Sequence, residues 1–261
     1  PATRCWSAGW RAPAWAPVRE LRLTTSDGEQ LGAWEFEGRP DAPAVVLLHG
    51  NGGSRGGCVA AAEIVGREGC TALAVTARAH GDSTGDLNDF GWSAALDVVA
   101  AVEHLERERP GRPVLVRGSS LGAAAAVFAA ARLGDRVAGY LLESPYADLR
   151  TAVSNRLRMR LPGPLAAIAE EGVRWTAPLV VPEFDAIAPA RAVREIPAGV
   201  PILVLAGDAD RHATLSEAEA LCAAAGPRAR LEVFPGAGHE GMRDADPPRY
   251  AALLRSFVGG R

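Results

Sequence analysis

The chain has 261 residues, of which 48% are hydrophobic and 23% charged, a balance typical of a globular protein with a substantial core. The formal net charge of −3 gives no electrostatic reason to expect nucleic acid or an anionic membrane as a partner. All 28 basic side chains are Arg, and the lack of Lys excludes both Schiff-base chemistry and the phosphate-binding lysine of a P-loop.

The spacing of the cysteines and the length of the apolar runs argue against a metal site and against a membrane span. The cysteines are far apart and form no C-x-x-C pair, so we expect free thiols and no metal site (Cys5, Cys58, Cys70 and Cys222). No apolar run approaches the length of a membrane span. The chain begins at Pro1 rather than Met, which leaves open an upstream anchor or signal sequence; a cytoplasmic location is favoured, and the sequence indicates no oligomeric state.

The first segment, residues 1–17, lacks periodicity and predicts an extended arm whose tryptophans pack against the domain (Trp6, Trp10 and Trp15). Residues 18–24 and 30–37 then alternate apolar and polar side chains, and Ser26-Asp27-Gly28 between them is a typical hairpin turn. The sequence therefore predicts an antiparallel pair of strands, half exposed, at an edge of a sheet.

From residue 44 onward, strand-like apolar runs alternate with helix-like segments, which is typical of a mostly parallel sheet with helices on both faces. The continuous apolar run 44–48 predicts a strand buried on both faces. We expect further strands at 72–76, 113–117, 137–142, 201–206 and 231–234, and helices at 59–67, 93–107, 121–133, 215–225 and 248–257. With the hairpin, this gives an eight-stranded α/β sheet in a single domain over residues 1–261.

The alternation of strands and helices is interrupted in residues 146–200, which are helical in character but irregular and rich in proline. We expect a small cap inserted over the top of the sheet, with the segment from Leu161 to Val181 forming the substrate-binding surface. Its apolar side chains should pack in part on the sheet and in part line an acyl pocket. The side chains in question are Leu161, Leu165, Ile168, Trp175, Leu179 and Val180.

A G-x-S-x-G motif follows the strand at 113–117, with Ser120 in its central position. A serine on a tight turn from strand to helix has its hydroxyl exposed, and its neighbours two residues away on either side are forced together. Gly118 and Gly122 satisfy that requirement for Ser120. For Ser119, Arg117 and Leu121 would occupy those places and clash. The motif therefore predicts Ser120 as a nucleophile, against the alternative of a chance Gly-Ser turn.

The strand at 44–48 runs into His49-Gly50-Asn51-Gly52-Gly53-Ser54, a glycine-rich loop that can turn backbone N–H groups toward an oxyanion. The alternative is a dinucleotide-binding loop. That motif requires a final glycine where this chain has Arg55, and an acidic residue after the next strand, where it has Thr76-Ala77-Arg78. The oxyanion interpretation is therefore favoured.

Other strand ends carry titratable side chains, and ligands of open α/β sheets bind at the carboxyl ends of the strands. We expect His80 to brace the loops and Glu143 to be a structural carboxylate, although Glu143 could also serve as a triad acid. Asp208 and Asp210 follow the strand at 201–206, and His239 lies on a glycine-rich loop after the last strand. The order Ser, Asp, His along the chain is the one that this architecture imposes on a catalytic triad.

These motifs together resemble those of the α/β hydrolases over nearly the whole chain. The matching segments are HGNGGS at 49–54, RAHGDSTG at 78–85, GSSLG at 118–122, ESPY at 143–146, GDAD at 207–210 and GAGH at 236–239. They are most similar to bacterial serine hydrolases related to monoglyceride lipases, serine aminopeptidases and ABHD-type membrane-associated lipases. The resemblance implies an α/β-hydrolase fold with Ser120 as nucleophile, Asp210 as acid and His239 as base. It also implies that the backbone N–H groups of Asn51 and Leu121 form the oxyanion hole.

One segment departs from the pattern of that branch. Where Asp-x-Arg-Gly-His-Gly is usual, this chain has Thr76-Ala77-Arg78-Ala79-His80-Gly81, which puts the local bracing role of the segment in question but not the triad.

The expected activity is hydrolysis of a small-molecule carboxylic ester through an acyl-enzyme on Ser120, without a metal or organic cofactor. Three alternatives stay open: a peptidase or amidase, a thioesterase, and a catalytically silent binding protein with the same fold. Acyl and alcohol specificity depend on the cap and cannot be read from one sequence.

Overall fold

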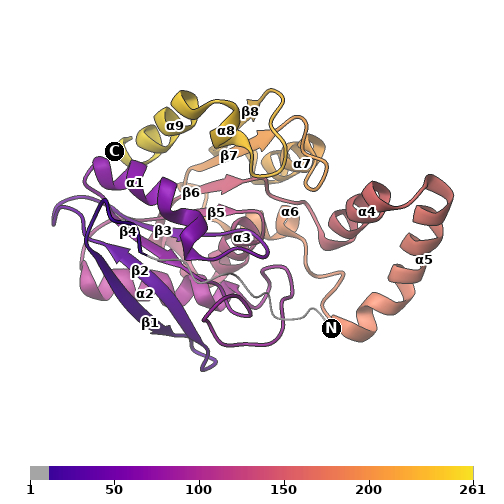
Figure 1. Cartoon of the computed structure of the whole chain (residues 1–261), viewed down its shortest axis with the longest axis horizontal. Helices are drawn as coiled ribbons and strands as arrows, with labels where there is room; N and C mark the ends of the chain where they lie inside the picture. Colours follow the sequence, from indigo (N-terminus) through magenta and orange to yellow (C-terminus); the bar gives the residue numbers. More distant parts are fainter. Residues whose placement is uncertain (1–11, 261) are drawn as a thin grey trace.

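The computed structural model describes residues 12–260, which contain an eight-stranded sheet with the strand order β1-β2-β4-β3-β5-β6-β7-β8 (Figure 1). The expectations for Trp6, Trp10 and Cys5 lie outside the described residues. Trp15 stacks on Phe36 with ring centroids 5.0 Å apart, which confirms that this tryptophan packs against the domain. The described cysteines, Cys58, Cys70 and Cys222, are free thiols as predicted.

The N-terminal hairpin consists of β1 (Val18–Thr24) and β2 (Gln30–Phe36), which pair antiparallel as predicted. Of these two strands, only β1 is at the edge of the sheet and half exposed. The expectation of exposure was wrong for β2, because β2 also pairs antiparallel with β4 (Thr71–Val75) and is covered on both faces. Trp34 on β2, for example, is fully buried beneath the guanidinium of Arg55, 4.9 Å from its ring centroid.

The other neighbouring strands of the sheet pair in parallel, so their carboxyl ends meet at one edge. The apolar runs of the inner strands are buried almost throughout because helices cover both faces, as expected for a parallel sheet, whereas β8 at the edge is only half-buried. These strands are β3 (Ala44–Leu48), β5 (Val114–Ser119), β6 (Val137–Glu143), β7 (Ile202–Gly207) and β8 (Ala229–Phe234).

Helices form a layer on each face of the sheet and enclose two cores. On one face α1 (Val59–Arg67) packs with α9 (Pro247–Gly259). On the other, α2 (Ala95–Glu108), α3 (Leu121–Leu133) and α7 (Leu215–Ala225) cover the sheet. This arrangement confirms the predicted mostly parallel sheet with an antiparallel N-terminal hairpin and helices on both faces. The short helices are η1 (Arg55–Cys58), η2 (Gly134–Arg136), α6 (Pro189–Ala192), η3 (Val193–Glu195), η4 (Gly226–Arg228) and α8 (Met242–Ala245).

Two further helices, α4 (Leu149–Arg160) and α5 (Gly163–Val180), form a hairpin that projects from the body of the domain (Figure 1). We expected its apolar side chains to pack in part on the sheet, but most of those in α5 are exposed. Ile168 is 70% and Leu179 82% exposed, and Leu165, Trp175 and Val180 are also exposed. The reason is that α5 packs against α4 rather than on the sheet, so its outer face has no second layer.

Candidate active site

Ser120 lies at the sharp turn between β5 and α3, with a backbone φ of 47° in the left-handed region. A Cβ atom on Gly118 would collide with the carbonyl oxygen of Gly122. A Cβ on Gly122 would lie 2.7 Å from Cβ of Leu48. The turn therefore requires glycine on both sides of the serine, as the spacing of the motif predicts.

The structure brings the three side chains of the predicted triad together from three loops. Nε2 of His239 lies 3.0 Å from Oγ of Ser120, and Nδ1 of His239 lies 2.7 Å from Oδ2 of Asp210. The residues come from the turn after β5, the loop after β7 and the loop after β8, all at the carboxyl edge of the sheet. In this geometry the imidazole can accept a proton from the hydroxyl while the carboxylate holds the other ring nitrogen.

The carboxylate of Asp210 is buried and held from both sides. Its Oδ1 accepts hydrogen bonds from the backbone N–H groups of His212 (2.8 Å) and Ala213 (3.0 Å). Burial would raise the pKa of Asp210, but the hydrogen bonds from His239 and from the two backbone groups outweigh it and leave the pKa below its usual value. Asp210 therefore stays ionised to a lower pH than an ordinary aspartate.

The two alternative acids have other partners. The carboxylate of Asp208 accepts a hydrogen bond from the backbone N–H of Gly236 at 2.6 Å. That of Glu143 lies against Arg117, with Nε to Oε1 at 2.8 Å, and accepts a hydrogen bond from the hydroxyl of Tyr250 at 2.8 Å. The prediction that Glu143 is a structural carboxylate is confirmed.

The loop at 49–54 lies directly beside the start of α3. A Cβ on Gly122 would come within 2.8 Å of the backbone oxygen of His49, so loop and helix are in close contact. Leu121 opens α3, and the first N–H groups of a helix have no partner within it. The side-chain oxygen of Asn51 accepts a hydrogen bond from Asn88 at 2.6 Å. The use of the Asn51 and Leu121 N–H groups as an oxyanion hole stays a prediction.

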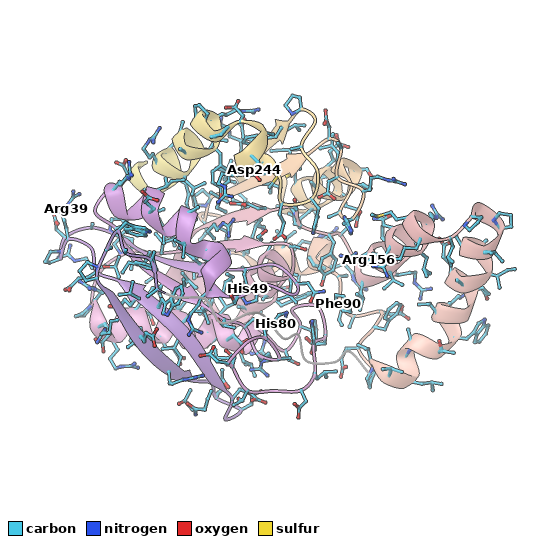
Figure 2. The ribbon with its side chains drawn as sticks, in the orientation of Figure 1. Arg39, His49, His80, Phe90, Arg156 and Asp244 are labelled. Carbon is cyan, nitrogen blue, oxygen red and sulfur yellow. The ribbon has the colours of Figure 1, made fainter. Side chains whose placement is uncertain are left out.

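His80 braces this loop, as predicted. Its Nε2 accepts a hydrogen bond from the backbone N–H of Gly52 at 3.1 Å, and its Nδ1 donates to the carbonyl oxygen of Arg78 at 2.8 Å. His49 and His80 lie edge to face, with ring centroids 5.0 Å apart, near the centre of the molecule (Figure 2). Both rings are buried and therefore belong to the support of the loop.

Arg78 holds the segment 76–81 to neighbouring elements, although the sequence of this segment is unusual. Its guanidinium binds Asp97 on α2 (2.8 Å) and Asp27 in the turn of the N-terminal hairpin (2.7 and 3.0 Å). The segment therefore keeps a bracing function through Arg78, although it departs from the usual motif.

Sequence reasoning missed Glu240, the neighbour of His239. Glu240 has a φ of 57°, its carboxylate accepts a hydrogen bond from the hydroxyl of Ser119, and its backbone N–H donates to Oγ of Ser144 at 3.2 Å. It thus ties the histidine loop to the ends of β5 and β6. The signal available in the sequence was its place beside His239, but nothing local indicates a contact with Ser119 across 121 positions.

The residues available for a metal overlap with the predicted triad. Asp210, His212 and His239 each offer one ligand atom, and these atoms lie within 4.8 Å of one another. His239 and Asp210 already hydrogen bond to each other, so a metal bound here would compete with that contact.

Over residues 12–260, no helix has the length and apolar character needed to cross a membrane.

The substrate surface predicted from Leu161 to Val181 does not enclose Ser120. The cavity in this part of the chain has a volume of about 450 Å³ and lies between α4 and α5, lined by side chains such as Val153, Leu157 and Val173. A smaller cavity of about 200 Å³ adjoins Ser119 and Glu240. A role of the hairpin in substrate binding therefore stays a prediction.

Comparisons with known proteins agree with this architecture. The chain is 29% identical over 249 residues to an uncharacterised protein of Mycobacterium tuberculosis, which covers 92% of this chain and 79% of that protein. It is 30% identical over 141 residues to a monoglyceride lipase of Homo sapiens, covering 52% of this chain and 46% of the lipase. Among solved structures, the Pyrococcus furiosus esterase Pf2001 superposes with a TM-score of 0.80 at 22% identity, covering 99% of this chain and 97% of the esterase.

A model of the alpha/beta hydrolase family matches residues 45–253, a range that contains Ser120, Asp210 and His239. This chain belongs to the alpha/beta hydrolase family.

Proposed function

We propose that this protein hydrolyses carboxylic esters, with Ser120 as nucleophile, His239 as general base and Asp210 as the acid that orients the imidazole. The observation that carries the proposal is the pair of hydrogen bonds from Ser120 to His239 (3.0 Å) and from His239 to Asp210 (2.7 Å) at a strained turn. A hydroxyl, an imidazole and a buried carboxylate in this order supply the groups that acyl transfer requires.

The reaction proceeds in two halves. As the Oγ–C bond forms at the ester carbonyl, Nε2 of His239 takes the hydroxyl proton and the carbonyl electron pair moves to oxygen. The N–H groups of Asn51 and Leu121 bind that oxyanion. His239 then donates its proton to the leaving alcohol oxygen as the C–O bond breaks. Water repeats the sequence on the acyl-enzyme and releases the acid.

We further propose that residues 1–261 act as a single domain and that the α4–α5 hairpin is its cap. The hairpin joins the body directly after β6, at the edge that carries Ser120, and α5 exposes an apolar face to solvent. Acyl chains are bound by apolar surface, so this face suits the acyl portion of an ester.

Covalent labelling tests the nucleophile. A fluorophosphonate should react with Ser120, and Ser120→Ala should lose both labelling and hydrolysis of aryl esters, whereas Ser119→Ala should keep them. Labelling at Ser119, or no labelling of folded protein, would contradict the assignment. Faster cleavage of aminoacyl amides or thioesters than of esters would instead replace the ester class by a peptidase or thioesterase class.

A further inference from the structure

Arg156 lies where the α4–α5 hairpin meets the body of the domain (Figure 2). Its neighbour Asn155 donates hydrogen bonds from Nδ2 to the carbonyl oxygen of His212 at 3.2 Å and to Oε2 of Glu217 at 2.7 Å. This part of α4 is therefore fixed against the loop that carries Asp210. Arg156 itself is half-buried.

The guanidinium of Arg156 has no carboxylate partner among the described residues. Its Nη1 donates to the carbonyl oxygen of Ala152 at 2.7 Å, a bond within the same helix. The charges of Glu217 and Asp210 act on it, but both carboxylates are committed elsewhere. Asp210 binds His239 and two backbone groups, and Glu217 accepts hydrogen bonds from Thr214 and from the backbone N–H of Ala147.

The other arginines of α4 show that this lack of a partner depends on position. Arg150 pairs with Asp185 at 2.6 Å, and Arg158 pairs with Glu170 on α5 at 2.7 Å. Arg160 is one turn after Arg156, so it lies on the same side of the helix. Within residues 12–260, neither Arg156 nor Arg160 forms an ion pair, whereas Arg150 and Arg158 each have an acidic partner.

Both unpaired arginines act on the histidine side of the site. Burial lowers the pKa of His212, and His239, Arg156 and Arg160 lower it further, while the charge of Asp210 opposes them. The ring of His212 lies 5.0 Å from the ring of His239, centroid to centroid. The loop to which Asn155 is bound thus carries His212 beside the imidazole that would donate a proton to the leaving alcohol oxygen.

We propose that Arg156, together with Arg160, forms a subsite for an anionic group on the alcohol portion of the ester. This inference rests on the proposed function, in which the alcohol leaves on the side of His239. A half-buried cation without a counter-ion is costly, and a phosphate or carboxylate of the substrate would supply the missing partner. Guanidinium groups bind both anions through two parallel hydrogen bonds. The substrate class is therefore an ester whose alcohol carries a negative charge.

A pair of esters that differ only in that charge tests the subsite. Release of butyrate is measured from 1-butyrylglycerol and from 1-butyrylglycerol 3-phosphate, and the ratio of their kcat/KM values is compared. We expect the wild-type protein to prefer the phosphate ester by about tenfold or more, the effect of a charge-assisted hydrogen bond. The butyryl ester of glyceric acid distinguishes carboxylate from phosphate, and a preference for either anion over the neutral ester supports the proposal.

Arg156→Gln should remove most of that preference while turnover of neutral 1-butyrylglycerol and the rate of fluorophosphonate labelling stay unchanged. Arg156→Lys, which keeps the charge, should retain part of it. Arg158→Gln is the matched control, since Arg158 is on the same helix but pairs with Glu170, and it should keep the full preference.

The outcomes separate this inference from the proposed function. If the neutral ester is cleaved and Ser120 is labelled but the anionic esters have no advantage, the subsite is wrong and the esterase proposal stands. Equal preference in the wild type and in both Arg156 variants would also overturn the subsite. If no ester is cleaved and Ser120 is not labelled in folded protein, both proposals fail.

Discussion

Ser120 adopts a φ of 47°, a conformation that costs a non-glycine residue roughly 1–3 kcal/mol. The surrounding contacts hold it there: its backbone N–H donates to the carbonyl oxygen of Glu143 at 2.8 Å, and Gly118 and Gly122 allow β5 and α3 to approach closely. The strain lifts the hydroxyl out of the sheet toward His239. The glycines two residues before and two residues after Ser120 were sufficient to identify this turn from the sequence.

In the sequence, only the resemblance to the α/β hydrolases favours Asp210 over Asp208 as the acid, and the structure supplies a physical basis for a test. We expect Asp210→Asn to lower kcat by roughly 10⁴-fold, because an amide that donates to Nδ1 of His239 favours the wrong tautomer. Asp208→Asn should have little effect, since Asp208 is exposed and bonds only to a backbone N–H among the described residues. Steady-state kinetics on an aryl ester measure both. The reverse order of effects would move the acid to Asp208.

Among the elements, α3 shows why the buried helices and strands could be predicted. Most of its side chains are buried and many are alanine, which lets the helix lie close to both the sheet and α2. The sequence pattern of such an element is a continuous apolar run with a glycine turn at its start. Such patterns predict where strands and helices lie, because an element that is buried on both sides consists mainly of apolar or small residues.

The position of α5 could not be predicted in the same way. Its apolar side chains suggest burial, yet α5 packs on α4 and leaves Ile168 and Leu179 exposed. Apolar periodicity shows that a helix has an apolar face but not which surface covers it. An exposed apolar patch on a folded chain is typical of a binding surface.

We expect Trp175→Ala to change acyl selectivity without changing the stability of the folded protein. Trp175 is 69% exposed, so the free energy of unfolding should stay within about 0.5 kcal/mol of wild type. If α5 binds acyl chains, kcat/KM should fall for long acyl esters and stay unchanged for acetate, since each buried methylene is worth roughly 1 kcal/mol. A chain-length series of aryl esters measures this. Thr176→Ala, a polar neighbour on α5, is the control, and equal chain-length profiles for both variants would exclude α5 from acyl binding.

Across the whole molecule, two buried arginines connect elements that are distant in the sequence. Arg117 on β5 binds Glu143 on β6, and Tyr250 on α9 donates to the same carboxylate. Arg78 connects α2 with the N-terminal hairpin through Asp97 and Asp27. Glu143 could be predicted as structural, but not its partners, which are 26 and 107 positions away. Such pairings are set by the fold as a whole and leave no local pattern.

His49 belongs to the same support and makes the stability of the whole domain depend on pH. The ring is fully enclosed, with Nε2 accepting a hydrogen bond from the backbone N–H of Ala77 at 3.0 Å. Burial lowers its pKa to about 3, and although the carbonyl of Gly50 opposes this, the charges of His80 and Arg117 lower it further. The folded protein therefore keeps His49 neutral, whereas in the unfolded chain it takes up a proton below a pKa of about 6.5.

Because the folded pKa is the lower one, the unfolded state binds more protons as the pH falls, and the stability present above about pH 6.5 is lost toward pH 3. His49 alone contributes a slope of about 1.4 kcal/mol per pH unit. Among the described residues, six carboxylates have lowered pKa values and add their own losses only near and below about pH 4, namely Asp27, Glu35, Asp82, Glu170, Asp210 and Glu232. Two other groups contribute between about pH 5 and 6: burial also lowers the pKa of His212, and burial raises the pKa of Asp97 to about 7, which has the opposite effect. Urea unfolding in this range therefore isolates His49 only as the difference between the wild type and a His49 variant. His49→Gln, which cannot titrate, should flatten the dependence by about one proton in this range. Equal slopes for the variant and the wild type would show that His49 takes up its proton without unfolding.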